Sequence, residues 1–429
     1  MGTITDNELD SVEKNIEDFS LKDFVNVQQA LEDRVKQFNQ VRDIYGNDYK
    51  KLYRREALSP MCNKLDLAIP DTGEKRSVIM FGSNNYQAMA GDERVLAAMK
   101  QATDVYGVGG GGSPLLCGTS TMHSLLESNM ASFKGKDECI LFSSGYTAQQ
   151  GWMKALLDKT DIVFMDAYSH TSFNEGLSLT GIKKVPFRHN NMDDLEKKLK
   201  AFRNRRRTAW IFVEGVYSMH GDTVDLKRVV ELSKKYDCKV AVDDAHGVGV
   251  LGKTGRGIEE HCDVDPADIT ISMGTFSKAF GAVGGYVCAS SFYSDYIRYM
   301  AKSHMFSASI PSAVAAAINE ALNIIRSEPE RAQALHDKVR YLVDGLCAAG
   351  IETSSQSAIV PIAIPLGANA RELAVEYDKE DIFVNLVDYP AVPLDQQRFR
   401  ATVIVSHTKE DLDRLIDATQ RIFTRHGLI

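Results

Sequence analysis

The middle of the chain alternates between short apolar runs and longer stretches in which apolar residues recur at helical spacing. The short runs are rich in β-branched residues and end in polar or glycine-containing turns, which is typical of buried strands. Strands that alternate with helices favour βαβ units and a mostly parallel sheet. The strands predicted in this way are Val78–Phe81, Cys139–Phe142, Ile162–Met165, Trp210–Val213, Lys239–Val242 and Ile269–Ser272.

Helices are predicted between these strands from apolar spacing and from capping signals. Ser120 is a favourable N-cap for a helix that runs to about Phe133 and stops at Gly135. Another helix opens at Ser143-Ser-Gly-Tyr146, directly after a strand. The remaining helices of this region are predicted at Glu93–Thr103, Met192–Phe202 and Leu226–Tyr236.

The two ends of the chain have a different pattern. Apolar residues at helical spacing predict a long amphipathic helix over Leu21–Tyr53, followed by a hairpin with its turn at Asp71-Thr-Gly73. Helices and strands in a new order follow after about Ser309. They are predicted as a helix over Val314–Ile325, a second helical run from Pro329 to Leu346, strands Ala358–Ile364, Ile382–Leu386 and Arg398–Val405, and a final helix from about Lys409.

This change of pattern predicts two lobes, for which 429 residues are ample. We expect a flexible N-terminus over 1–20 and a segment over 21–76 that joins the small domain. A large domain is expected over 77–310 and a C-terminal α+β small domain over 311–429.

Composition excludes several classes of protein. The content of 44% hydrophobic and 25% charged residues is typical of a soluble globular protein. The net charge of −8 gives no overall positive field that would attract nucleic acid. The basic run Arg203–Arg207 is interpreted as a solvated loop, although it could meet an acidic carrier. The polar N-terminus is no signal peptide, and no apolar run is long enough to span a bilayer, so we expect a cytoplasmic protein.

The seven cysteines are scattered and contain no C-x-x-C pair. This spacing argues for reduced thiols and against a disulfide framework or a zinc site. No metal is therefore expected.

Reactive side chains fall at one kind of position along the predicted sheet, just past the carboxyl end of a strand. In open α/β sheets the ligand crevice lies at that edge. The sequence therefore predicts one site that gathers them. The side chains are those of Tyr146, His170, Ser218, Asp243, His246 and Lys278.

Lys278 follows a buried strand and stands on a turn with Thr275 and Ser277. Burial lowers a lysine's pKa and makes its amine nucleophilic, which suits a Schiff base with pyridoxal phosphate (PLP). The two hydroxyls would then hold the phosphate. The non-functional alternative is that Lys278 is a surface lysine in a hydroxyl-rich loop. Asp243, also after a buried strand, needs a cationic partner such as a protonated pyridine nitrogen. The helix that opens at Tyr146 offers a further phosphate site.

Two glycine patterns, Gly107–Gly112 and Gly247–Gly252, match the G-x-G-x-x-G of dinucleotide-binding enzymes. That motif needs a strand before it and a helix opened by it, and neither match is predicted to have both. An oxidoreductase is therefore the weaker alternative. A third class, a non-catalytic subunit of a heteromeric synthase, is expected to lack the lysine, but Lys278, Asp243 and His170 are all present.

With these residues in hand, the chain resembles the α-oxoamine synthases, a family of fold-type I PLP enzymes, and within it the serine palmitoyltransferase branch of soluble bacterial enzymes. The resemblance runs in order from about residue 25 to the end. The stretches that carry it are Gly82–Tyr86, Gly118-Thr119, Ser144–Tyr146, Asp166–His170, Glu214–Met219, Asp222, Asp243–His246, Gly255–Gly257, Gly274–Lys278, Phe306–Pro311, Ser357–Val360, Val384–Leu386, Pro390–Pro393, Arg398–Arg400 and His407-Thr408.

The resemblance implies a role for each site residue. The catalytic set is Lys278 as the Schiff-base lysine, Asp243 on the pyridine nitrogen, His170 stacked on the ring, and His246, which with Ser218 faces the phenolic oxygen. Gly145, Tyr146, Thr275 and Ser277 hold the cofactor and its phosphate, and Ser307 and Ser309 reach the phosphate of the neighbouring subunit. Arg400 binds the amino acid's carboxylate bidentately, and Asn85 and Tyr86 line the substrate side.

The fold implied is α/β, the PLP-dependent transferase fold type I. It has a mostly parallel central sheet in a large domain, a smaller α+β domain, and a homodimer that shares its active sites. The implied reaction is the decarboxylative condensation of serine, alanine or glycine with an acyl thioester to give an α-amino ketone. The alternatives left open are activities like 8-amino-7-oxononanoate synthase or 2-amino-3-ketobutyrate CoA ligase, and an acyl donor on a carrier protein instead of coenzyme A.

Two positions depart from the family pattern. The arginine that follows Gly-Ser after the glycine run is replaced by Pro114, and the arginine before the Pro-Ala-x-Pro loop of serine palmitoyltransferases is replaced by Asp388. A reversed charge beside the active-site loop argues against palmitoyl transfer itself. We expect Asp388 to turn away from the substrate carboxylate and to pair with a cation or to meet a polar part of the donor.

Overall fold

The computed structural model describes residues 30–44, 51–69, 72–203, 208–388 and 392–429. Some predictions fall wholly or partly outside these ranges. They are the flexible N-terminus over 1–20, residues 21–29 and 45–50 of the helix predicted over Leu21–Tyr53, Asp71 of the hairpin turn, most of the basic run Arg203–Arg207, and the first two residues of Pro390–Pro393.

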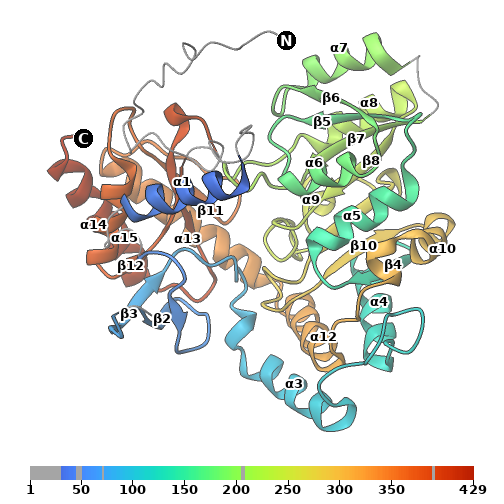
Figure 1. Ribbon diagram of the computed structural model, residues 1–429, viewed down its shortest axis with the longest axis horizontal. Coiled ribbons are helices and arrows are strands. Elements are labelled where there is room, and N and C mark those ends of the chain that lie inside the picture. The colour runs from blue at the N-terminus through green and yellow to red at the C-terminus, as the bar shows by residue number, and fades with distance from the viewer. Residues whose placement is uncertain (1–29, 45–50, 70–71, 204–207, 389–391) are drawn as a thin grey trace.

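Seven strands form the central sheet in the order β4-β10-β9-β8-β7-β5-β6 (Figure 1). The pairs β6–β5, β5–β7, β7–β8 and β8–β9 are parallel, whereas β10 lies between β4 and β9 and is antiparallel to both. The predicted α/β fold with a mostly parallel sheet is confirmed. The strands are β4 Glu138–Phe142, β5 Ile162–Asp166, β6 Lys183–Phe187, β7 Ala209–Glu214, β8 Lys239–Asp243, β9 Ile271–Thr275 and β10 Gly285–Ala289.

Helices cover both faces of this sheet, because alternate residues of a buried strand point to opposite sides. On one face Ile211 of β7 shares a core with Leu199 of α7 and Val229 of α8. On the other face the ring of the next residue, Phe212, packs 5.2 Å from Trp152 of α5. The helices of this lobe are α3 Glu93–Tyr106, α4 Thr121–Lys134, α5 Gly145–Leu156, α6 Thr171–Ser178, α7 Met192–Phe202, α8 Leu226–Tyr236, α9 Ile258–His261, α10 Ser291–Met300, α11 Lys302–Met305 and α12 Ser312–Ser327.

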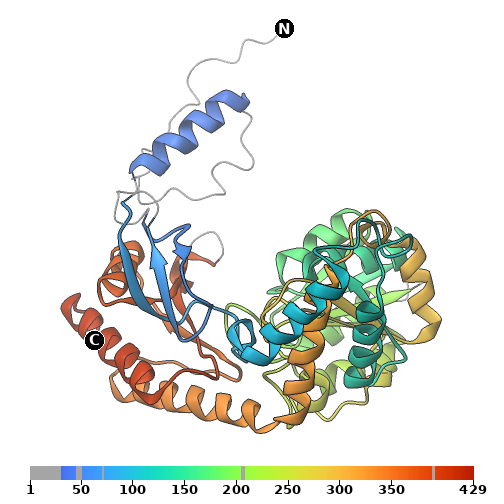
Figure 2. The ribbon, with the colours of Figure 1, turned by 90° about the horizontal axis from the view of Figure 1, so that it is seen from below.

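A second lobe lies beside the first and contains two smaller sheets, β1-β2-β3-β12 and β11-β14-β13 (Figure 2). Its first sheet contains strands from the N-terminal and the C-terminal parts of the chain, since Ile382 of β12 pairs in parallel with Ile79 of β3. β3 also crosses the boundary expected at residue 76, and the four-part domain division stays a prediction. The elements are α1 Leu31–Ile44, β1 Glu56–Ala57, β2 Lys64–Ala68, β3 Lys75–Met80, α13 Glu330–Ala348, β11 Ile359–Ala363, α14 Ala370–Lys379, β12 Ile382–Phe383, β13 Asn385–Val387, β14 Arg398–Thr402 and α15 Lys409–Arg425.

Several predicted elements need correction. The strand expected at Ile269–Ser272 is β9, Ile271–Thr275, and the strand expected over Ile382–Leu386 is two strands, β12 and β13, in different sheets. The described part of the N-terminal helix is α1, Leu31–Ile44, and residues 51–53, which the prediction included, are not helical. Its residues Leu31, Val35 and Phe38 are 60%, 49% and 38% exposed.

Two strands of the central sheet gave no clear signal in the sequence. The edge strand β6 contains two lysines and a proline, which are exposed, and buries only Val185 and Phe187, a pattern typical of edge strands. β10 begins at Gly285, directly after a glycine-rich turn. Along the described ranges no helix combines the length and the apolar character that crossing a membrane requires.

Candidate functional site

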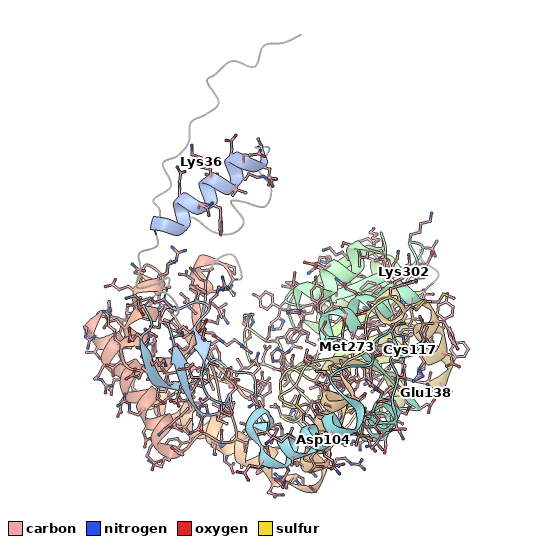
Figure 3. All side chains as sticks on the ribbon, turned by 60° about the horizontal axis from the view of Figure 1, so that its bottom comes forward. Lys36, Asp104, Cys117, Glu138, Met273 and Lys302 are labelled. Carbon is pink, nitrogen blue, oxygen red and sulfur yellow. The ribbon has the colours of Figure 1, made fainter. Side chains whose placement is uncertain are left out.

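A pocket opens at the carboxyl edge of the central sheet, and its empty volume is about 710 Å³. The turns that follow β4, β5, β8 and β9 all contribute to it, as a parallel sheet with its crossovers requires. Met273, labelled within the larger lobe in Figure 3, also lines the pocket. The lining residues are Ser144, Gly145, Tyr146, His170, Ser172, Glu214, Asp243, Ala245, His246, Met273, Thr275, Ser277 and Lys278.

Lys278 stands three residues beyond β9 with its amine in this pocket. Burial lowers the pKa of Lys278 to about 8, although the carboxylate of Asp243 acts in the opposite direction. The nearby charge of Arg400 lowers this pKa further. About a tenth of the amine is therefore unprotonated at pH 7, and the unprotonated amine is the nucleophilic form.

Asp243 and Glu214 occupy paired positions at the ends of β8 and β7. Burial raises the pKa of Asp243, and the charge of Lys278 opposes that shift. Burial also raises the pKa of Glu214 well above its usual value, and the charge of Asp243 adds to this effect. Two neighbouring buried carboxylates disfavour each other's ionisation. A cationic group beside Asp243 would therefore be needed to keep Asp243 ionised. No role was predicted for Glu214, although Glu214 and Asp243 both directly follow a predicted buried strand, and this shared position is the signal that could have identified it.

His170 follows β5, stands at the N-cap of α6 and lines the pocket. Its backbone N–H donates to Glu214 Oε1, and its ring Nδ1 lies 2.8 Å from Ser172 Oγ. Burial lowers the pKa of His170, with Asp243 opposing. The ring is therefore neutral at pH 7 and suited to stacking.

A chain of hydrogen bonds connects the smaller lobe to the pocket. Arg400 of β14 donates from Nε to the carbonyl oxygen of Ser218 at 2.6 Å and from Nη2 to Asn84 Oδ1 at 2.9 Å. The Tyr86 hydroxyl lies 3.4 Å from the same Asn84 oxygen and 2.6 Å from His246 Nδ1. Because burial holds the pKa of His246 well below its usual value, its ring is neutral.

The structure does not bring Asn85 into this chain. Its amide nitrogen donates to the carbonyl oxygen of Met61 at 2.7 Å, and its oxygen accepts from the Ala90 N–H at 3.3 Å. Its neighbour Asn84 is the residue that contacts Arg400 and Tyr86. The sequence does not distinguish the two adjacent asparagines, because only the geometry of the turn determines which side chain faces the site.

The N-terminus of α5 provides a cradle for an anion. Ser144 caps the helix and accepts from the Thr147 N–H at 3.1 Å. A Cβ added to Gly145 would lie 2.8 Å from Thr275 Cβ, so only glycine allows this close approach. The hydroxyls of Thr275 and Ser277 are 2.9 Å apart beside it. Helix N–H groups and paired hydroxyls are the groups that bind phosphate.

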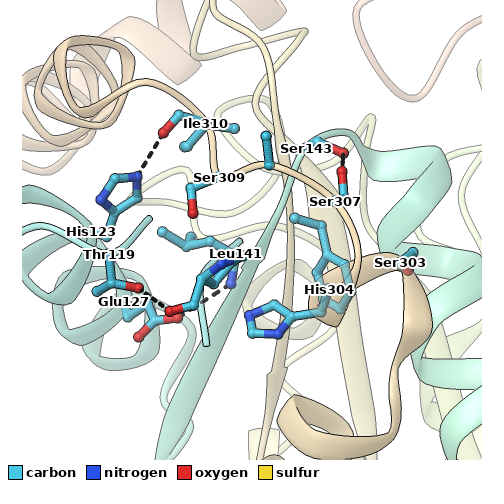
Figure 4. Close-up of a pocket in the computed structure, with 13 residues that line it drawn as sticks. Thr119, His123, Glu127, Leu141, Ser143, Ser303, His304, Ser307, Ser309 and Ile310 are labelled. Carbon is cyan, nitrogen blue, oxygen red and sulfur yellow. Dashed lines mark hydrogen bonds between the residues drawn. The ribbon is translucent and has the colours of Figure 1, made fainter. Parts of the chain in front are cut away.

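Ser307 and Ser309 line a second, smaller pocket next to the first, shown in Figure 4. Ser307 Oγ lies 3.4 Å from Ser143 Oγ, one residue before the cap of α5. Ser309 Oγ has no hydrogen-bond partner within the described part of the chain. Contact of these serines with a neighbouring subunit's phosphate stays a prediction. Pro114 also borders this pocket, and its carbonyl oxygen accepts from the Thr119 hydroxyl at 2.7 Å.

These residues fit PLP as a group. The pocket holds an amine for the cofactor's aldehyde, a carboxylate for its ring nitrogen and an anion cradle for its phosphate. Neither glycine pattern forms a dinucleotide motif, since Gly107 caps the end of α3 and the first helix after Gly252 begins at Ile258. Among the described residues no cluster of three or more His, Cys, Asp or Glu could hold a metal ion.

Asp388 is not among the residues that line the pocket. Its Oδ2 lies 3.4 Å from Arg371 Nη2, and its Oδ1 accepts from Gln397 Nε2. The expectation that Asp388 pairs with a cation is confirmed. The reversed charge is therefore neutralised within the smaller lobe.

Comparison with known proteins gives a consistent result. Residues 76–418 match the family described as aminotransferase class I and II. An 8-amino-7-oxononanoate synthase from Symbiobacterium thermophilum is 37% identical over 82% of this chain and 90% of its own length. A serine palmitoyltransferase from Bacteroides ovatus is 37% identical over 82% of this chain and 89% of its own length. The 4-hydroxy-2,2'-bipyrrole-5-methanol synthase PigH of a Serratia species is 34% identical over 92% of this chain, which spans only 60% of PigH.

Solved structures agree in fold over nearly the whole chain. The Sphingomonas wittichii serine palmitoyltransferase superimposes with a TM-score of 0.87 at 30% identity and covers 94% of this chain and 100% of its own. A high-resolution serine palmitoyltransferase structure that holds PLP gives a TM-score of 0.86 at 29% identity, with the same coverage of 94% and 100%.

Proposed function

Because the chain belongs to the aminotransferase class I and II family and, within it, to the PLP-dependent α-oxoamine synthases, we propose that it condenses a small amino acid with an acyl thioester. The amino acid is serine, alanine or glycine, carbon dioxide and the thiol leave, and the product is an α-amino ketone. One observation carries the proposal. Lys278 and Asp243 share a pocket toward which the other lobe extends Arg400, whose charge lowers the pKa of Lys278.

PLP, when bound, supplies an aldehyde for the substrate amine and a ring that withdraws electrons from the amino acid's Cα. Asp243 would hold the proton on the ring nitrogen, and the neutral imidazole of His170 would lie against the ring. Lys278 removes the Cα proton and returns a proton later. Arg400 binds the substrate carboxylate with its planar fork, while Tyr86 and His246 hold each other in place beside it.

The acyl donor is the part of the reaction on which this chain's relatives differ. Relatives of similar identity are named for 8-amino-7-oxononanoate, for a bipyrrole methanol and for serine palmitoyl transfer, so overall identity does not select a substrate. Asp388 stands where serine palmitoyltransferases carry an arginine, and this replacement favours a donor other than palmitoyl-coenzyme A. We propose a thioester on a carrier protein as the second candidate.

The test is a titration of purified, PLP-loaded protein with glycine, alanine and serine in turn. Binding is monitored through the visible absorption of the cofactor. Acyl thioesters of varied length are then added on coenzyme A and on a carrier protein, and release of carbon dioxide is measured. We expect one amino acid to perturb the absorption at the lowest concentration and one donor class to support turnover. Absence of turnover with every pair of amino acid and donor would contradict the proposed function.

Asp388→Arg is expected to leave amino-acid affinity nearly unchanged and to alter preference among acyl donors, because Asp388 is engaged by Arg371 and Gln397. The measurements are amino-acid titration and kcat/KM for coenzyme A and carrier-protein donors. Asp395→Arg, the same charge change at an exposed residue, is the matched control. Strong tightening of amino-acid binding with unchanged donor preference would show that residue 388 faces the carboxylate.

We propose further that the enzyme is a homodimer with shared sites, in which Ser307 and Ser309 serve the neighbouring subunit. Ser309 supports this proposal, because its buried Oγ has no partner within the described part of one chain. Light scattering coupled to size exclusion should give a dimer under assay conditions. A monomer with full activity would contradict it.

A further inference from the structure

His189 lies between two carboxylates at the carboxyl edge of the central sheet. Its Nδ1 is 3.0 Å from Asp166 Oδ1 and its Nε2 is 2.8 Å from Asp222 Oδ2. A neutral imidazole carries one N–H and can donate to only one of them, so this arrangement fits the doubly protonated, cationic ring. Burial lowers the pKa of His189, but the hydrogen bonds to Asp166 and Asp222 outweigh it and raise the pKa to about 9.

Aromatic stacking ties the same segments together a second time. The Tyr168 ring lies 4.4 Å from the ring of His189 and 4.6 Å from the ring of His220, with interplanar angles of 21° and 13°. Tyr168 lies two residues beyond Asp166, the last residue of β5. His220 lies in the turn after β7, which also contains Asp222. Ring stacking and ion pairing therefore hold three segments, from β5, β6 and β7, in one arrangement.

The segment after β5 and the turn after β7, which His189 joins, each contain a proposed site residue. The segment after β5 ends in His170, which lines the pocket. The turn after β7 contains Ser218, whose carbonyl oxygen accepts from Arg400 Nε at 2.6 Å. The Tyr217 N–H donates to the Asp222 carbonyl oxygen at 3.0 Å, so the position of Asp222 is coupled to that of Ser218.

We infer that His189 is a positioning residue, a charged clamp that holds the segment of His170 and the turn of Ser218 in register so that the His170 ring faces PLP and Arg400 faces the substrate carboxylate. The inference rests on the proposed roles of His170 and Arg400. His189 itself need not touch cofactor or substrate, because it acts through Asp166 and Asp222.

The test is His189→Gln, which keeps one donor and one acceptor but cannot carry the charge. We expect the dissociation constant for PLP, measured by titrating the apo-protein, to rise about ten- to a hundredfold, the range for losing one charge-assisted hydrogen bond. The amino-acid KM should rise more than kcat falls. His261→Gln, at an exposed histidine of α9, is the matched control and should bind PLP as the wild type does.

A pH series separates the charge of His189 from its shape. The groups that face it are Asp166, Asp222, Tyr168, Tyr217 and His220, with Arg398 beside Asp222. Since the pKa of His189 is raised to about 9 from 6.5, the clamp's contribution is complete below about pH 6.5 and is lost as pH rises through about 9. The wild type's advantage over His189→Gln in PLP affinity should shrink over this range, and the titration of Lys278 is common to both proteins.

Two results would overturn the inference. One is a His189→Gln protein with a lower melting temperature but wild-type affinity for PLP, which would mark a structural role only. The other is an affinity difference that stays constant above pH 9. If His189→Gln does not fold, Asp222→Asn removes one carboxylate with little change of shape and should give the same rise in dissociation constant. PLP titration needs no substrate, so failure of the proposed condensation leaves this test intact.

Discussion

Lys278→Ala is expected to lose turnover by at least about a hundredfold, since a positioned acid–base group contributes about 10²–10⁴-fold. The physical reason is that Lys278 supplies an amine with a lowered pKa in the pocket. In the proposed function, this amine binds the cofactor's aldehyde and moves the Cα proton. The measurements are kcat at saturating amino acid and donor, and the visible absorption of the purified protein. Both should be lost together.

Lys253→Ala, at an exposed lysine outside the pocket lining, is the matched control for this prediction and should behave as the wild type. Retention of turnover within about tenfold of the wild type would show that Lys278 is misassigned, because a positioned acid–base group typically contributes about 10²–10⁴-fold. The rate at which the wild-type apo-protein captures PLP should rise with pH and level off above about 8, where the Lys278 amine has lost its proton.

Arg400→Ala is expected to weaken amino-acid binding about ten- to a hundredfold, because a charge-assisted pair with a carboxylate contributes about 1.5–3 kcal/mol. Arg400 is buried, and its present hydrogen bonds to Ser218 and Asn84 orient its guanidinium before substrate arrives. The measurement is the amino-acid dissociation constant from the visible titration of the PLP-loaded protein. Affinity for PLP should change much less.

Two further variants sharpen this result. Arg400→Lys keeps the charge but loses the planar fork, so it should recover only part of the affinity. Arg421→Ala removes a surface arginine that pairs with Glu380 at 2.9 Å and serves as the matched control. If Arg400→Ala bound amino acids as the wild type does, the carboxylate anchor would have to be another cation.

Local signals in the sequence were sufficient for the elements whose ends are marked by caps. The predicted helices Met192–Phe202 and Leu226–Tyr236 match α7 and α8, and Ser120 and Gly135 bound α4 as expected. A capped helix can be recognised because its signal lies within one or two turns of chain. Lys278 and Asp243 were predicted as site residues for the same reason, since each directly follows a recognisable strand.

Elements whose identity depends on distant partners were missed or misplaced. The run Ile382–Leu386 looks like one strand, but β12 pairs with β3 and β13 pairs with β14 in another sheet. The placement of Asn84 in the site, in place of Asn85, follows from the turn after β3 and from Arg400, more than three hundred positions along the chain. Neither partner is visible in a local window of sequence.

The sequence by itself determined the α/β class, the row of reactive residues at one sheet edge, and a family resemblance that the comparisons confirm. These follow from periodicity and from ordered motifs, which are properties of the chain alone. Only the tertiary structure decided which groups carry charge: a raised pKa for Glu214, a pKa of about 8 for Lys278, and a cationic His189 between Asp166 and Asp222. Protonation depends on burial and on charges brought together from separate strands, and folding alone brings them together.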